Sequence, residues 1–133
     1  MSNPAQPWHA YAKATDFSIE PGGLLVQFTD GRSHRLHVFE TDHTWLLRGL
    51  VVRHATRETD ATPALSAALK NRHSRMYGLR VDKQGKLIGE THVPKPGLTP
   101  VEFQLHARHL AAECDRLEYL ITGLDREARG REK

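Results

Sequence analysis

Histidine is the residue type in this chain that most clearly could bind a metal or transfer a proton, because nine of the 133 residues are histidines. His106 and His109 lie in a segment whose pattern predicts a helix. At about 100° per residue, Glu102 and Glu113 fall on the same helical face, and such a set could bind a divalent metal. This segment has neither an H-E-x-x-H motif nor the E-x-x-H spacing of di-iron bundles. We therefore interpret the four side chains as Glu–His pairs along a partly exposed face and expect no metal or other cofactor.

Nucleophilic catalysis has no signature in the sequence. The chain contains no G-x-S-x-G motif and no glycine-rich loop that opens a helix and could hold a phosphate. Its one cysteine, Cys114, lies on the apolar stripe of a predicted helix, which is typical of a small buried side chain. A single cysteine also excludes a disulfide within the chain. These features predict a protein that is not an enzyme.

Positive charge is concentrated in the middle of the chain. The formal net charge is +3, and residues 61–97 carry seven Lys and Arg against two Asp and Glu. Cations near an aromatic residue can bind single-stranded nucleic acid by charge and stacking, and the segment 70–86 has this composition around Tyr77. One tyrosine is a poor stacking platform, so we interpret the segment as solvated charge and keep nucleic-acid binding as the alternative function. Its candidate residues are Lys70, Arg72, Arg75 and Arg80.

Alternating apolar residues predict three strands in the first half of the chain, after an arm that Trp8 and Tyr11 anchor. The first strand region begins at Phe17 and is interrupted by Pro21-Gly22-Gly23, a turn or bulge. Asp30-Gly31 predicts the hairpin to the second strand. The third strand, residues 44–53, has apolar residues at both odd and even positions, which is typical of a strand covered on both faces.

The second half of the chain alternates between helix and strand signals. Thr62-Pro63 predicts the start of a short helix that ends near His73. Residues 77–81 and 87–93 predict a second hairpin. The order βββ-α-ββ-α, with mostly hairpin connections, predicts an α+β domain with a mostly antiparallel five-stranded sheet. We expect residues 1–16 to form an arm or short helix, residues 17–124 a single domain and residues 125–133 a charged tail.

The longest predicted helix spans residues 98–124. Thr99 and Glu102 form a capping box, and Pro100 fits the first helical position. A stripe of apolar residues spaced by three and four predicts the face that covers the sheet. The stripe consists of Phe103, Ala107, Leu110, Cys114, Leu117, Ile121 and Leu124.

A second apolar stripe lies on another side of this helix, about 150° away. It consists of Val101, Leu105, Ala112 and Tyr119. One sheet cannot bury both stripes, so we expect a further covering surface, either a second subunit or a partner protein. The alternative is that the N-terminal arm and the short helix of the same chain cover the stripe.

Targeting signals are not evident in the sequence. No apolar run approaches the roughly 20 residues that span a bilayer. The first residues lack the basic and then apolar pattern of a signal peptide. We therefore expect a cytoplasmic protein without a membrane partner.

A set of short segments in the second half of the chain carries a resemblance to a known family. The segments are Tyr77 to Asp82, Gln84-Gly85, Lys86 to Gly89, Val93-Pro94, Leu98 to Phe103 and Cys114 to Leu117. On these residues the chain resembles the type III secretion chaperone-like fold, in particular the YbjN family of bacterial proteins. The similarity covers about residues 17–124 and departs from the family at the front, where a substantial amphipathic helix is usual. It implies a non-enzymatic homodimer that binds an extended segment of another protein, or regulates one.

We expect the partner to lie on exposed sheet or helix surface, for example as an added strand at an edge. The candidate partner-binding residues are those predicted on the face opposite Leu36 and Val38, namely Leu25, His37, Phe39, Trp45 and Leu47. Val101, Leu105, Ala112 and Tyr119 are the candidate dimer or packing surface. The identity of the partner is not readable from these residues.

Overall fold

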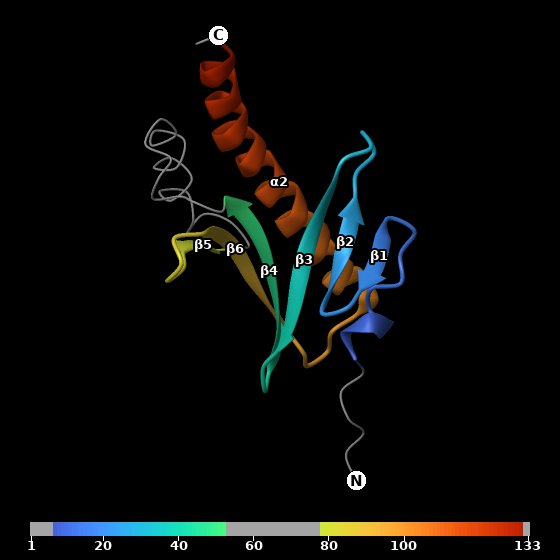
Figure 1. Ribbon diagram of the computed structural model, residues 1–133. Coiled ribbons are helices and arrows are strands. Elements are labelled where there is room, and N and C mark those ends of the chain that lie inside the picture. The colour runs from blue at the N-terminus through green and yellow to red at the C-terminus, as the bar shows by residue number, and fades with distance from the viewer. Residues whose placement is uncertain (1–6, 53–77, 132–133) are drawn as a thin grey trace.

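A six-stranded antiparallel sheet forms most of the computed structural model, which describes residues 7–52 and 78–131, with side chains described up to residue 121. The strands lie in the order β1-β2-β3-β4-β6-β5, and the helix α2 packs across one face of the sheet (Figure 1). The elements are η1 (Trp8–Ala10), β1 (Phe17–Glu20), β2 (Gly23–Gln27), β3 (Ser33–Glu40), β4 (Thr44–Val52), β5 (Gly78–Val81), β6 (Leu87–Pro94) and α2 (Pro100–Arg131). The expected helix at residues 62–73 lies outside the described residues.

The sheet has six strands where the sequence predicted five, because the first predicted strand is a hairpin. Glu20 pairs with Gly23, so Pro21 and Gly22 alone form the turn between β1 and β2. Gly22 has a φ of 76°, and a proline followed by a residue with positive φ is the pattern of a type II turn. The expected hairpin at Asp30-Gly31 is confirmed, since an Asp30 carboxylate oxygen accepts the Arg32 N–H at 2.9 Å.

The predicted N-terminus of the long helix is confirmed in detail. Pro100 is the first residue of α2, and the Thr99 hydroxyl accepts the Glu102 N–H at 3.2 Å. The same hydroxyl also donates to the Glu102 carboxylate at 3.3 Å, so the side chains of the two capping residues bond each other directly. The helical backbone continues beyond Leu124 to Arg131, through most of the segment expected to be a tail.

The core lies between α2 and the sheet. The predicted stripe from Phe103 to Ile121 is buried, whereas the side chain of Leu124 is outside the described set. Cys114 sits over Gly49 and Gly89, which pair with each other in β4 and β6. The two glycines leave the space that the thiol occupies, so the helix can approach the middle of the sheet closely.

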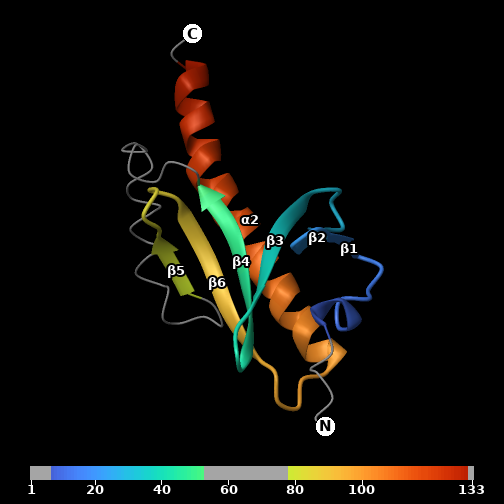
Figure 2. The same ribbon diagram turned by 60° about the horizontal axis from the view of Figure 1, so that its bottom comes forward.

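Residues 8–12 cover the first turns of α2, as Figure 2 shows. The Trp8 and Tyr11 rings stack on Phe103 at centroid distances of 6.5 and 6.0 Å. The Gln104 amide donates to the Tyr11 carbonyl at 3.0 Å. These contacts confirm that the two aromatic residues anchor the arm. None of the described helices is long and apolar enough to cross a membrane.

Candidate functional site

The two faces of the sheet differ, and strand register decides which residues each face presents. Leu47 pairs with Val38, so both side chains point toward α2. Trp45 lies on the same face two residues earlier, and the exposed fractions of Trp45 and Leu47 are 4% and 0%. Their assignment to a partner-binding face opposite Leu36 and Val38 was therefore wrong. Three consecutive apolar residues follow Thr44 at the start of this strand, and such a run does not reveal which positions face inward.

The outer sheet face, meaning the side away from α2, retains the other three candidates. Leu25 is half-buried there, while His37 and Phe39 are exposed. Phe39 has an exposed fraction of 43%, which is high for a large apolar side chain. Pairing in the sheet adds more residues to this face, which are Arg35, Leu46, Arg48, Leu50, Arg80, Ile88 and Glu90.

A cluster of three charged side chains crosses the outer sheet face. The Glu90 carboxylate accepts hydrogen bonds from Arg48 Nε at 2.8 Å and from Arg80 Nε at 2.6 Å. Burial alone would raise the pKa of Glu90, but the hydrogen bonds from Arg80 and Arg48 outweigh it and hold that pKa below its ordinary value. Two cations thus share one anion, and the cluster keeps one net positive charge.

Phe39 stands beside this cluster. The Arg48 guanidinium lies 4.9 Å from the centroid of the Phe39 ring, within cation–π distance. The His37 ring lies next to it at a centroid distance of 6.3 Å. The outer sheet face therefore combines an exposed aromatic side chain with a fixed positive charge.

Two depressions adjoin beside His37 and Leu50, which line both of them. The first lies on the outer sheet face, and the second opens where β3 and β4 separate and reaches α2 at Glu118. The first has a volume of about 410 Å³ and is lined by His37, Phe39, Arg48, Leu50, Asp82, Gln84, Lys86 and Ile88. The second has a volume of about 460 Å³ and is lined by Leu25, Ser33, His34, Arg35, His37, Leu50 and Glu118. Together they form a groove that runs from the outer sheet face to the gap between β3 and β4, with Leu50 and Ile88 among its lining residues.

Asp82 is an acidic residue in the first depression, and its carboxylate is hydrogen-bonded within the turn between β5 and β6. The carboxylate accepts the backbone N–H groups of Lys86 and Gln84, each at 2.9 Å. These hydrogen bonds, of which the one from the Lys86 N–H has the largest effect, hold the pKa of Asp82 below its ordinary value. Lys86 forms no ion pair within 4 Å among the described residues.

His34 marks the place where β3 and β4 separate, and sequence reasoning assigned it no role. The register between these strands ends at the pair Leu36 and Gly49. Figure 1 shows the ribbons of β3 and β4 diverging toward one end of the sheet. Beyond it, His34 Nε2 lies 2.8 Å from the Leu50 carbonyl oxygen. His34 Nδ1 lies 3.7 Å from Asp115 on α2, so the imidazole links both strands to the helix. Its alternation with Leu36 was the available signal for an inward-facing histidine.

The second stripe of α2 lies on the surface, as its pattern predicted. The exposed fractions are 75% for Val101, 55% for Leu105 and 59% for Tyr119, and Ala112 is also exposed. The described part of the N-terminal arm packs elsewhere, against Phe103 and Gln104, so this part does not cover the stripe. The role of the stripe as a dimer surface stays a prediction.

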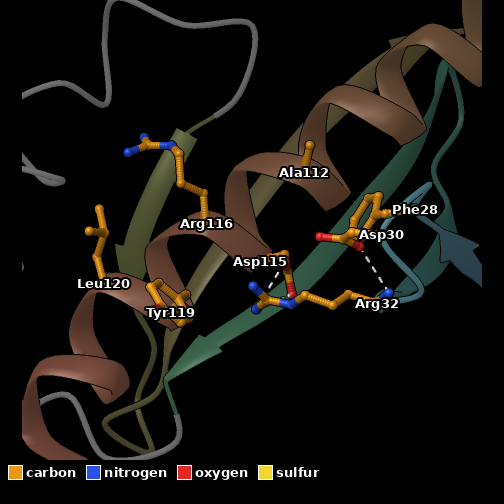
Figure 3. A pocket seen from close by; sticks show the side chains of 8 residues that line it. All are labelled: Phe28, Asp30, Arg32, Ala112, Asp115, Arg116, Tyr119 and Leu120. Carbon is orange, nitrogen blue, oxygen red and sulfur yellow. Dashed lines mark hydrogen bonds and ion pairs between the residues drawn. The ribbon is translucent and has the colours of Figure 1, made fainter. Parts of the chain in front are cut away.

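A depression opens beside this stripe, between α2 and the β2–β3 hairpin (Figure 3). Arg32 crosses it, with its guanidinium 3.1 Å from the Asp115 carboxylate and 5.2 Å from the Tyr119 ring centroid. The volume is about 270 Å³, and the lining residues are Phe28, Asp30, Arg32, Ala112, Asp115, Arg116, Tyr119 and Leu120.

The structure adds little support for the candidate nucleic-acid residues, the metal site or a reactive cysteine. Lys70, Arg72 and Arg75 lie outside the described residues, and Arg80 pairs with Glu90. No group of three metal-ligating side chains occurs among the described residues. Burial raises the pKa of the Cys114 thiol to about 12, so it is neutral at physiological pH.

Comparisons with known proteins identify a similar fold. No protein-family model matches the sequence, and no curated protein matches it either. A chain in the heterodimeric ExoU–SpcU complex, from the type III secretion system of Pseudomonas aeruginosa, superposes with a TM-score of 0.59 at 13% identity, over 75% of this chain and 83% of that one. A chain of the HopA1–SchA chaperone–effector complex has a TM-score of 0.45 at 19% identity, over 77% and 74%. The chain therefore shares the α+β fold of a chain in the ExoU–SpcU complex.

Proposed function

We propose that this chain is a non-enzymatic protein-binding module, which acts as a homodimer and has a chaperone-like or regulatory effect on a partner protein. The observation that carries the proposal is the groove across the outer sheet face, with Phe39 exposed at its side. The fold adds support, because the similar chain comes from a complex between two different proteins. We further infer that the protein is bacterial and cytoplasmic. The support for this inference is the resemblance to the YbjN family.

The groove has the chemistry of a site for an extended polypeptide. Side chains of an extended segment alternate in direction about every 3.3 Å, so alternate residues of a bound segment would enter the floor at Leu50 and Ile88. A carboxylate on the segment would meet Arg48 and Lys86. With Arg80, these cations number three against the two carboxylates beside them, Glu90 and Asp82. The favoured ligand is therefore an extended segment that combines apolar and acidic residues. Binding would shield such a segment from water and from other chains.

A displayed library of short peptides tests this assignment and requires no identified partner. We expect selected peptides to be rich in apolar and acidic residues and to bind the purified chain in fluorescence polarisation. Phe39→Asp should weaken their binding at least about tenfold, which corresponds to roughly 1.4 kcal/mol. Ile19→Asp is the matched control, because Ile19 is equally exposed but lies in the edge strand β1. Selected peptides that bind both variants as tightly as the unchanged chain would overturn the assignment.

Nucleic-acid binding through the segment 70–86 is the alternative, and Arg80 is its one described candidate. The bond from Arg80 to Glu90 leaves that guanidinium partly neutralised. A low-salt mobility assay with single-stranded DNA checks this alternative. A shift that Arg80→Ala weakens would favour it over peptide binding.

A further inference from the structure

We propose that two copies of this chain associate through antiparallel α2 helices, with the two-fold axis at Ala112 and Leu105 of each copy packed on Tyr119 of the other. The proposal deepens the homodimer part of the proposed function and names the surface that forms it. Leu105 and Tyr119 are both more than half exposed, and Ala112 lies between them on the helix.

The spacing of these residues is symmetric. Leu105 and Tyr119 each lie seven residues from Ala112, in opposite directions. Seven residues make nearly two helical turns, so the three side chains share one line with a drift of about 20° per step. An antiparallel copy with its axis at Ala112 therefore places Leu105 opposite Tyr119, and Ala112 opposite itself.

The sizes of the side chains fit this arrangement. An alanine at the crossing point lets two helix axes approach to the short end of the usual 8–10 Å range, roughly 8 Å. The depression of about 270 Å³ extends between Ala112 and Tyr119 and is walled by Phe28 (Figure 3). Its apolar lining residues, Phe28, Ala112, Tyr119 and Leu120, offer a seat for Leu105 of the second copy beside the Arg32–Asp115 ion pair. Small residues at the centre and large ones on both sides give a self-complementary profile.

The charges on one flank are also self-complementary. In an antiparallel helix pair related by a two-fold axis, each flank meets the same flank of the other copy. Arg108 and Asp115 share a flank, four residues before and three residues after Ala112. Arg108 of each copy would therefore face Asp115 of the second copy across the interface.

Both residues already belong to ion pairs that this contact would join. Arg108 Nε lies 2.7 Å from Asp16, and Arg32 lies 3.1 Å from Asp115. Association would produce a row of alternating charges, Asp16, Arg108, Asp115 and Arg32, with the last two from the second copy. A parallel pair would place Leu105 against Leu105 and lose this alternation. The match of size and charge to the same chain favours a second copy over an unrelated partner.

Cysteine cross-linking tests the register directly. Cys114 is buried, so a cysteine introduced on the stripe is the one that reacts in the folded protein. We expect Ala112→Cys to form a disulfide-linked dimer on mild oxidation, and Leu105→Cys alone to stay mostly uncross-linked. A mixture of Leu105→Cys and Tyr119→Cys should cross-link across copies. Efficient self-linking of Leu105→Cys, or none with Ala112→Cys, would overturn the antiparallel register.

Charge reversal tests the flank contact. Arg108→Asp and Asp115→Arg each place like charges opposite one another and should shift the mass in light scattering from twice 15.0 kDa toward 15.0 kDa. An equimolar mixture of the two variants restores opposite charges at both contacts and should form a heterodimer. Dimers of either single variant, or a mixture that stays monomeric, would contradict the proposal.

A further variant covers the case in which charge reversal disturbs folding. Ala112→Arg adds a long charged side chain at an exposed position on the axis and should yield a folded monomer, while Ile19→Arg should remain a dimer. Circular dichroism checks the fold of every variant.

The peptide assay on the outer sheet face tests the proposed function separately, since Phe39 and Ala112 lie on different faces of the molecule. If the unchanged chain is a monomer in light scattering yet still binds peptide, the proposed interface is refuted and the peptide site is retained.

Discussion

The Sγ atom of Cys114 lies where a side chain at Gly89 would stand, since a Cβ atom on Gly89 would be only 2.8 Å from it. Gly49, the partner of Gly89 in the sheet, has the same relationship at 2.9 Å. Helix and sheet thus interlock at one point, and this contact sets how closely α2 approaches β4 and β6.

Gly89→Ala should destabilise the protein by about 1–3 kcal/mol, because the added methyl group overpacks the contact with Cys114. Cys114→Ala in the same chain removes the clashing sulfur, so the double variant should be more stable than the sum of the single changes predicts. Urea unfolding measures all three variants. Gly78→Ala is the control, because no atom lies within 4 Å of a Cβ at that position. Additive effects in the double variant would show that the clash is relieved elsewhere.

The Cys114 thiol should not react with a thiol reagent in the native protein, even at mildly alkaline pH. Burial raises its pKa to about 12, so the reactive thiolate is scarce, and the side chain is inaccessible. Denaturant should release one reactive thiol per chain, the number in the sequence. Absorbance of the released chromophore measures both states. Rapid reaction without denaturant would contradict the described packing.

Acid should destabilise the protein in part through Glu90. The folded-state pKa of Glu90 is lowered, so its ion pairs contribute stability above the pKa of the unfolded chain, and this contribution is lost as the pH falls through the lowered value. The loss therefore lies on the acid side of its usual value of 4.5.

Glu90→Gln should lower the free energy of unfolding at neutral pH, because it leaves Arg48 and Arg80 without their shared carboxylate. It should also flatten the decline of stability in acid. Urea unfolding at a series of pH values measures both effects, and Glu40→Gln serves as the comparison because Glu40 is exposed and pairs with one lysine. An unchanged acid profile would show that Glu90 contributes little.

Local signals in the sequence predict the structure correctly where each depends on neighbouring residues. The capping box at Thr99 and Glu102 involves one helical turn, and the turn at Asp30-Gly31 involves a few adjacent residues. The buried stripe of α2 follows from helical periodicity alone. Pro21-Gly22 was less clear, because a two-residue turn between two short strands resembles an interruption within one strand.

The face of β4 depended on contacts between strands. Trp45, Leu46 and Leu47 are all apolar, so alternation could not say which of them points inward. Pairing with β3 decided the matter and placed Trp45 and Leu47 under α2. The candidate binding face therefore kept Phe39 and lost these two residues.

By itself the sequence determined the secondary structure around its clearest turns, and the N-terminal cap and both stripes of the long helix, because these are set by short-range geometry. Only the tertiary structure brought Arg48 and Arg80 to Glu90, placed His34 between β3 and β4, and aligned the groove beside Phe39. These residues come from segments far apart in the chain. Their meeting depends on strand order and register, which arise from packing of the whole sheet against α2 and not from the pattern of any one segment.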